Sequence, residues 1–290
     1  MPNNIIQLVS GLWVGQSRLF QTNHGIFLSE GEAFLVDPGI YPDEIENIAR
    51  FVSEQSASVQ SVVLTHSHWD HILGPERFPG VKITAQASYT AQAHEHDLLI
   101  KSILEWQEKA GLQRDRPFTI PLPDQTFGDS TALRVGSLLL RLTHAPGHAA
   151  DQLTIYHEES GTLWAADMLS DLEIPFVSHN LIAYQRTLEK LAEWDIRALV
   201  PGHGHTTVDP QEIRTRISED IEYLAELRSR VEAAVQRGKT LEEAVSECAE
   251  MTYRNPLDNA HPHSWNVESA YVELGGERGD AKVGWERETV

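Results

Sequence analysis

Short apolar runs separated by turn residues mark the N-terminal part of the chain. Runs at residues 12–14, 25–28 and 33–36 alternate with polar and glycine-containing turns, a pattern that predicts a meander of β-strands. Residues 42–54 carry apolar side chains at helical spacing, and residues 61–65 form a run typical of a strand. This succession predicts a layered α/β fold. A further strand is predicted at residues 81–84 and a helix at residues 87–110.

The second half of the chain repeats this order of elements. Strands are predicted at residues 137–142, 152–156 and 162–165, and the last two bracket a short turn as a hairpin does. Apolar residues recur at helical period over 181–194, and a short apolar strand follows at 198–200. Both halves therefore run from strands through a helix to a further strand.

Beyond residue 210 the pattern becomes helical. Apolar residues recur every three or four positions from Ile213 to Val235 and define one helix face, and a second helix begins near Leu241. We therefore expect a first domain at residues 1–210 and a helical C-terminal extension with a tail at residues 211–290.

Two segments of the extension show no helical period. The tail after Gly275 is rich in Gly, Glu and Arg, and we expect it to be poorly ordered. His261-Pro262-His263 lies among polar residues, and we expect surface histidines in a loop there. Neither segment is predicted to carry chemistry.

Composition narrows the class of function. The chain has 290 residues and a formal net charge of −20, so it would repel the phosphates of nucleic acid rather than attract them. No apolar run of membrane-spanning length occurs. The single cysteine, Cys248, fits a reducing compartment, and the first residues lack the pattern of an export signal. These features predict a cytoplasmic protein with a small-molecule partner, no nucleic acid and no membrane, and they leave the oligomeric state open.

Residues 66–71 read His-Ser-His-Trp-Asp-His and directly follow the predicted strand 61–65. Four metal-capable side chains thus lie within six residues. His66 and His68 are two positions apart, so an extended backbone can aim both imidazoles the same way. Asp70 and His71 follow where the chain turns and can face a second point close by. Histidine clusters in acidic proteins are often only surface residues, but the density of ligands after an apolar strand indicates a metal site.

Three further residues occur alone in similar settings. His148, Asp167 and His203 each follow an apolar run, and the two histidines are preceded by a glycine that permits close approach of the backbone. The order His-x-His-x-Asp-His, Gly-His, Asp and Gly-His resembles the metallo-β-lactamase superfamily over about residues 8–205. The extension resembles that of glyoxalase-II-like members.

The resemblance implies a four-layer αββα sandwich with metals at the sheet edge and a C-terminal helical extension. It also implies a division of the seven ligands between two divalent ions. His66, His68 and His148 would hold the first ion, whereas Asp70, His71 and His203 would hold the second. Asp167 would bridge the two.

This ligand set predicts a hydrolase. Two ions sharing a water lower its pKa towards neutrality and supply hydroxide to an electrophilic carbonyl. Zinc suits imidazole and carboxylate donors, although iron or manganese is compatible with the same ligands. Asp70 is predicted to be catalytic, because it would orient the hydroxide and later protonate the leaving group. The expected substrate is an ester, thioester or lactone of a small molecule.

Three more residues are predicted to support the site. The resemblance makes His179 and Tyr184 candidates for contact with substrate, although packing would explain either one equally well. Asp37 follows a predicted strand and precedes Pro38, where an aspartate often only forms a turn, but the resemblance implies that it accepts hydrogen bonds from the metal loop. The alternative function is a persulfide dioxygenase of the same fold, which would use a single iron ion.

Overall fold

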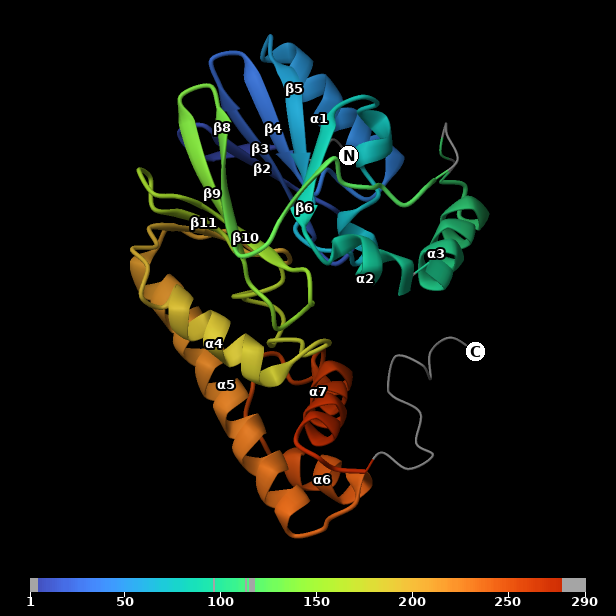
Figure 1. Cartoon of the computed structure of the whole chain (residues 1–290), viewed down its shortest axis with the longest axis vertical. Coiled ribbons are helices and arrows are strands. Elements are labelled where there is room, and N and C mark those ends of the chain that lie inside the picture. Colours follow the sequence, from blue (N-terminus) through green and yellow to red (C-terminus); the bar gives the residue numbers. More distant parts are fainter. Residues whose placement is uncertain (1–4, 96, 113, 115–117, 278–290) are drawn as a thin grey trace.

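The computed structural model describes residues 5–95, 97–112, 114 and 118–277 (Figure 1). Most of the C-terminal tail, residues 278–290, is outside these ranges, so the expectation about the tail falls largely outside the described residues. Within the described ranges, no helix is both long enough and apolar enough to cross a membrane.

Two β-sheets form the centre of the molecule. The first sheet has seven strands in chain order: β1 (Ile6–Val9), β2 (Leu12–Gln16), β3 (Asn23–Ser29), β4 (Glu32–Val36), β5 (Ser58–Val63), β6 (Lys82–Gln86) and β7 (Gln125–Phe127). Strands β1 to β4 pair antiparallel, and β4 to β7 pair parallel. The second sheet has the order β12-β11-β10-β9-β8, with bounds β8 (Ser130–Val135), β9 (Leu138–His144), β10 (Leu153–His157), β11 (Thr162–Trp164) and β12 (Ala198–Val200).

The two sheets pack face to face through one hydrophobic cluster. Phe34 and Val63 of the first sheet contact a cluster that includes Leu142, Trp164 and Val200 of the second. All five side chains are almost fully buried, and burial of each large apolar side chain contributes about 1.5–3 kcal/mol. This cluster fixes the sheets against each other, so the loops at their common edge have defined relative positions.

Helices cover the outer faces of both sheets. On the first sheet, α1 (Pro42–Glu54) buries Ile45, Ile48 and Val52 against a cluster that contains Leu35 and Val62. On the second sheet, α4 (Leu181–Leu191) and α5 (Pro210–Gln236) pack on β11 and β12. The layers are therefore helix, sheet, sheet and helix, which confirms the predicted αββα arrangement. The remaining helices are η1 (Trp69–His71), η2 (Pro75–Arg77), α2 (Tyr89–Glu95), α3 (Asp97–Lys109), α6 (Leu241–Cys248) and α7 (Ala260–Glu273).

The C-terminal extension shares its core with the sandwich. α5 runs away from the sheets, α6 packs on it at the far end, and α7 lies between α6 and the sandwich (Figure 1). One hydrophobic cluster joins Leu163 and Leu199 of the second sheet to Leu224 of α5 and Val267 of α7. The division at residue 210 stays a prediction, because apolar packing is continuous across it.

The helical stretch predicted at residues 87–110 contains α2 and α3, and residue 96 between them lies outside the described residues. One prediction about local structure was wrong. The expected loop around His261-Pro262-His263 is the first turn of α7, where proline is tolerated because its missing N–H would have no helical partner. His263 is buried there rather than exposed.

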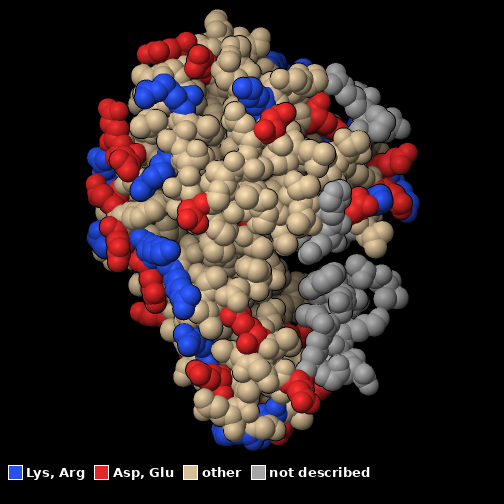
Figure 2. Space-filling model, viewed as in Figure 1, with Lys and Arg blue, Asp and Glu red and all other residues tan. Residues whose placement is uncertain are grey.

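Charged residues are mixed on the surface. Figure 2 shows Lys and Arg interleaved with Asp and Glu along the edges of the face in view, around a central area with few charges. This face carries no continuous basic patch of the kind that nucleic-acid binding requires.

Candidate metal centre

Four loops deliver the candidate ligands to one edge of the sandwich. The first connects β5 to η1 and carries His66, His68, Asp70 and His71. The others follow β9, β11 and β12 and carry His148, Asp167 and His203 respectively. β11 and β12 pair parallel, so Asp167 and His203 emerge at the same end of neighbouring strands.

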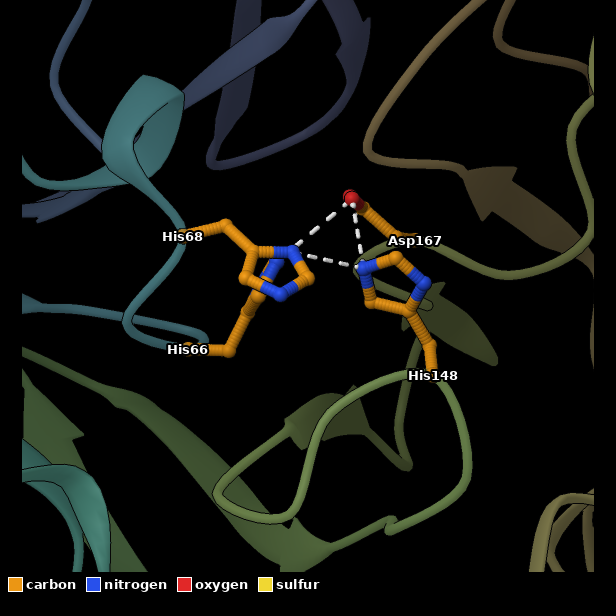
Figure 3. A group of neighbouring side chains, drawn as sticks. All are labelled: His66, His68, His148 and Asp167. Atoms are coloured by element: carbon orange, nitrogen blue, oxygen red, sulfur yellow. Dashed lines mark hydrogen bonds and ion pairs between the residues drawn. The ribbon is translucent and has the colours of Figure 1, made fainter. Parts of the chain in front are cut away.

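The seven side chains form two ligand groups. The first ligand group contains His66, His68, His148 and Asp167, and the second contains Asp70, His71 and His203. Within each group the candidate ligand atoms all lie within 4.8 Å of one another. Figure 3 shows the three imidazoles of the first group converging on the Asp167 carboxylate.

Asp167 lies between the two groups. Its Oδ2 is 3.4 Å from Nε2 of His66 and 3.2 Å from Nε2 of His148. Its Oδ1 is 3.2 Å from Nε2 of His71, and its Oδ2 is also 3.2 Å from Nε2 of His203. One carboxylate therefore contacts imidazoles of both groups, which is the geometry that a bridging ligand needs.

The backbone at Asp167 and the loop that bears His203 approach each other closely. Ala166 has φ +50°, a conformation that non-glycine residues adopt infrequently, and its carbonyl accepts a hydrogen bond from Gly202 N at 2.5 Å. A Cβ atom added at Gly202 would lie 2.0 Å from Oδ1 of Asp167. Only glycine at this position lets the loop that bears His203 approach the carboxylate so closely.

Hydrogen bonds to the protein fix which nitrogen of three histidines faces the centre. Nδ1 of His71 contacts Asp37 Oδ2 at 2.9 Å, Nδ1 of His148 contacts Phe176 O at 2.9 Å, and Nδ1 of His203 contacts Phe20 O at 3.1 Å. An Nδ1–H that donates to an oxygen leaves the lone pair on Nε2. His68 differs, because its Nδ1 is the atom that lies 2.9 Å from Nε2 of His148.

Neighbouring histidines lower the pKa values of the two carboxylates in the centre. Burial raises the pKa of Asp70, but the charges of His71 and His203 outweigh this effect and lower it to about 2. Burial would likewise raise the pKa of Asp167, yet its histidine neighbours hold that pKa well below the usual value. Both carboxylates are therefore anionic at neutral pH and attract cations.

These residues fit divalent metal ions. His66 Nε2, His71 Nε2 and Asp167 Oδ1 are buried and have no hydrogen-bond partner among the described residues. Buried polar atoms normally have partners, and here several such atoms point at common centres. Burial also lowers the pKa of His66 to about 4, so its Nε2 is a neutral donor at physiological pH. The set of imidazole and carboxylate donors matches zinc and related ions.

Metal uptake by the metal-free protein should release about two protons per chain near pH 8. Burial would lower the pKa of His203, but Asp167 and Glu173 raise it to about 10, and carboxylates likewise raise the pKa of His71 well above its usual value. Both imidazoles are protonated below these pKa values and must lose their protons to bind a cation. Metal affinity should therefore rise with pH up to about 10.

Calorimetry of zinc binding in buffers of different ionisation enthalpy measures this release. A binding heat that does not depend on the buffer would contradict the protonation states assigned to His71 and His203.

Asp37 occupies the position expected of it. Its carboxylate accepts hydrogen bonds from Thr65 N at 2.8 Å, from Thr65 Oγ1 at 2.5 Å and from His71 Nδ1. It therefore ties the backbone of the metal loop to one of the candidate ligands. Its φ of +44° is a conformation that aspartate tolerates better than most residues.

The substrate contacts expected of Tyr184 and His179 stay predictions. Tyr184 is 0% exposed, and its hydroxyl donates to the backbone carbonyl of Asp167 at 2.9 Å. Tyr184 therefore contacts the backbone of a candidate ligand. His179 is exposed, and its charged neighbours are Glu273 and His144 rather than any of the seven candidate ligands.

Glu173 is a residue that the sequence did not single out. It lies in the segment between Asp167 and α4, and its carboxyl interacts electrostatically with His203, Asp167 and Asp70. Burial raises its pKa. No motif or spacing in the sequence marks this glutamate, because its place near the centre depends on how the segment before α4 folds.

Comparison with known proteins agrees with this geometry. Residues 18–203 match the model of the metallo-beta-lactamase superfamily. The "Beta-lactamase-like protein 2 homolog" of Drosophila melanogaster is 25% identical over 193 residues, which cover 65% of this chain and 60% of that protein. The "Hydroxyacylglutathione hydrolase" of Methylobacterium sp. (strain 4-46) is 29% identical over 160 residues, or 54% of this chain and 53% of that protein. The chain thus spans less than two thirds of the length of either relative.

Solved structures share the fold. A metallo-beta-lactamase family protein from Thermus thermophilus has a TM-score of 0.65 and 22% identity, with 93% of this chain and 95% of that chain covered. The sec-alkylsulfatase from Pseudomonas sp. has a TM-score of 0.74 and 18% identity, and the match covers 96% of this chain and 51% of that one. The family model spans more than half of the sequence, and the chain belongs to the metallo-β-lactamase superfamily.

Proposed function

We propose that this protein is a dinuclear metal-dependent hydrolase of a small-molecule ester, thioester or lactone. The observation that carries the proposal is the meeting of seven imidazole and carboxylate side chains in two groups joined by Asp167. His66, His68 and His148 would hold one ion and Asp70, His71 and His203 the other, with Asp167 shared between them. Zinc is the ion that we propose, because it prefers this mixture of nitrogen and oxygen donors.

Two such ions would polarise the scissile carbonyl and supply a hydroxide nucleophile at neutral pH. The chain's own carboxylates and imidazoles prepare the site for this chemistry. Asp167 and Asp70 supply two negative charges in a buried place, and Asp37 and the carbonyls of Phe20 and Phe176 hold three imidazoles in one orientation. Such preorganisation means that little rearrangement accompanies reaction.

Asp70 is suited to orient the attacking water. Its pKa of about 2 keeps the carboxylate ionised, and bound cations would favour that state further. A carboxyl group with so low a pKa carries no proton at neutral pH and therefore has none to donate to a leaving group. We therefore assign to Asp70 the orientation of the nucleophile, and we look for the leaving-group proton elsewhere.

Glu173 is our candidate for that proton donor, and its replacement by glutamine gives a direct test. Burial raises the pKa of Glu173, and its carboxyl group interacts electrostatically with candidate ligands of both groups. For substrates with poor leaving groups, kcat of Glu173→Gln should fall by about 10²-fold. For activated p-nitrophenyl esters, whose leaving group needs no proton, kcat should change little.

The matched control is Glu189→Gln, which alters an exposed glutamate of α4. It should leave both substrate classes unaffected. An equal fall of kcat for poor and good leaving groups in Glu173→Gln would remove the proton-donor role.

The substrate class is tested with a panel of acyl esters, acyl thioesters and lactones. The relative named hydroxyacylglutathione hydrolase acts on a thioester by its name, and this supports including thioesters first. Metal-loaded enzyme should hydrolyse at least one class, and chelation of the metal should abolish the activity. Failure on all three classes by protein that holds two ions would contradict the proposed substrate range.

A further inference from the structure

The C-terminal extension holds the segment that runs from Asp167 into the first turn of α4. We call residues 169–182 the crossover segment. Side chains of the extension accept hydrogen bonds from its backbone: the buried Asp220 from Leu169 N at 3.2 Å, Asn259 from Ile174 N at 3.3 Å and Asn266 from Val177 N at 2.7 Å, and the half-buried Glu273 from Leu181 N at 2.6 Å. The extension therefore determines the path of a segment that borders the metal centre.

Asn266 makes the tightest of the asparagine contacts in this set. It lies in α7, is 0% exposed, and its amide oxygen accepts from Val177 N at 2.7 Å. Its amide nitrogen donates to Pro175 O at 2.7 Å and to Tyr223 Oη at 2.9 Å. Both donors and the acceptor of the amide are thus used. The side chain therefore hydrogen-bonds the backbone of the residues before and after Phe176.

The same peptide unit reaches the metal centre at its other end. Val177 N and Phe176 O belong to one planar peptide group. Asn266 holds the N–H end of this group, and Nδ1 of His148 contacts the carbonyl end at 2.9 Å. A rotation of this peptide would move both ends together, so the orientation of Asn266 is transmitted to His148.

A buried hydrogen-bond chain fixes the amide of Asn266 in turn. Tyr223 Oη accepts from Asn266 and lies 2.9 Å from His263 Nδ1, and His263 Nε2 donates to the carbonyl of Cys248 at 2.9 Å. Burial lowers the pKa of His263, which favours a neutral ring with its proton on Nε2. His263 Nδ1 then accepts from the Tyr223 hydroxyl. The amide has no freedom to flip without breaking this chain.

We infer that Asn266 is a positioning residue for the metal centre, which aims the Phe176 carbonyl at His148 and thereby strengthens binding of the ion in the first ligand group. The C-terminal extension would then contribute to metal binding as well as to the hydrophobic core. This inference rests on the ligand assignment of the proposed function. Loss of an outer partner of a ligating histidine weakens metal binding by about 10–100-fold. Because Asn266 acts through a peptide group, we expect the lower end of that range.

The test compares Asn266→Ala with Asn259→Ala. Both replace a buried asparagine of the extension that bonds the crossover segment, but Asn259 holds Leu172 O and Ile174 N rather than the peptide at Phe176. Zinc is titrated into metal-free protein against a chromophoric chelator, which gives two dissociation constants without any assay of activity. His68→Ala, which removes a ligand of the first group only, identifies which constant belongs to that group.

Asn266→Ala should bind the first-group ion about 10-fold more weakly, with the second constant unchanged. Asn259→Ala should keep both constants of the wild type, even if its melting temperature falls. Asn266→Ser, which leaves a shorter side chain unable to span both peptides, should reproduce the result if the alanine variant does not fold.

Two outcomes would overturn the inference. One is an Asn266 variant with both wild-type constants, and the other is an equal weakening of both ions in the Asn266 and Asn259 variants. A wild-type protein that binds no zinc at all would contradict the proposed function instead, so the two failures are distinguishable.

Discussion

Replacing Asp167 by alanine should release both metal ions and lower kcat/KM by about 10³-fold or more. Among the described residues, Asp167 is the carboxylate that contacts imidazoles of both ligand groups, so each ion would lose a ligand without it. A metal ion contributes several kcal/mol to stabilisation of the transition state, and each 1.36 kcal/mol is about a tenfold change in rate. Metal content by mass spectrometry and steady-state kinetics on the same sample measure both effects.

The matched control is Asp171→Ala. Asp171 lies four residues further along, and its carboxylate contacts Nδ1 of His205, which is not a candidate ligand, at 2.8 Å. This variant should retain two ions and near-normal activity. An Asp167→Ala protein that still bound two ions tightly would contradict the bridging role.

His68→Ala should lose the ion of the first group, retain that of the second and lose hydrolysis by a similar factor of about 10³. His68 contacts His148 at 2.9 Å and belongs only to the first group. Its imidazole contributes little to the fold, because the loop that bears it is held by Asp37 and Thr65. Far-UV circular dichroism should therefore be almost unchanged.

His205→Ala provides the comparison, since His205 is an exposed histidine two residues after His203. It should keep both ions and full activity. Wild-type activity and metal content in His68→Ala would exclude this histidine from the centre.

The elements that the sequence predicted well are those with a clear periodic pattern. The helix predicted at residues 42–54 is α1 with the same bounds, because one apolar face packs on the sheet. The strand predicted at 198–200 is β12.

The sequence pattern did not predict α7, because polar side chains lie on its buried face. Its buried face includes His263, Asn266 and Glu268 beside apolar residues, so the usual hydrophobic period is absent. Asn266 is buried where it accepts a hydrogen bond from the crossover segment, and His263 is buried where it contacts the Tyr223 hydroxyl. A helix that holds a loop by polar contacts is not visible to a search for apolar periodicity.

The candidate ligands were accessible to sequence reasoning, whereas the groups that orient them were not, apart from Asp37. Metal-binding side chains have distinctive types and spacing, as in the run from His66 to His71. The carbonyls of Phe20 and Phe176 carry no such signature, because any residue supplies the same backbone oxygen. Tyr184 was noticed, but only the fold shows that it is buried beneath Asp167.

The measurement that tests the central claim most directly is the metal content of the purified protein, with zinc, iron and manganese quantified per chain. The proposed dinuclear centre predicts about two ions per chain, mostly zinc, after exposure to excess metal and removal of unbound ions. A single iron ion per chain would contradict it and would favour the dioxygenase alternative. Protein that holds no metal after the same treatment would contradict both.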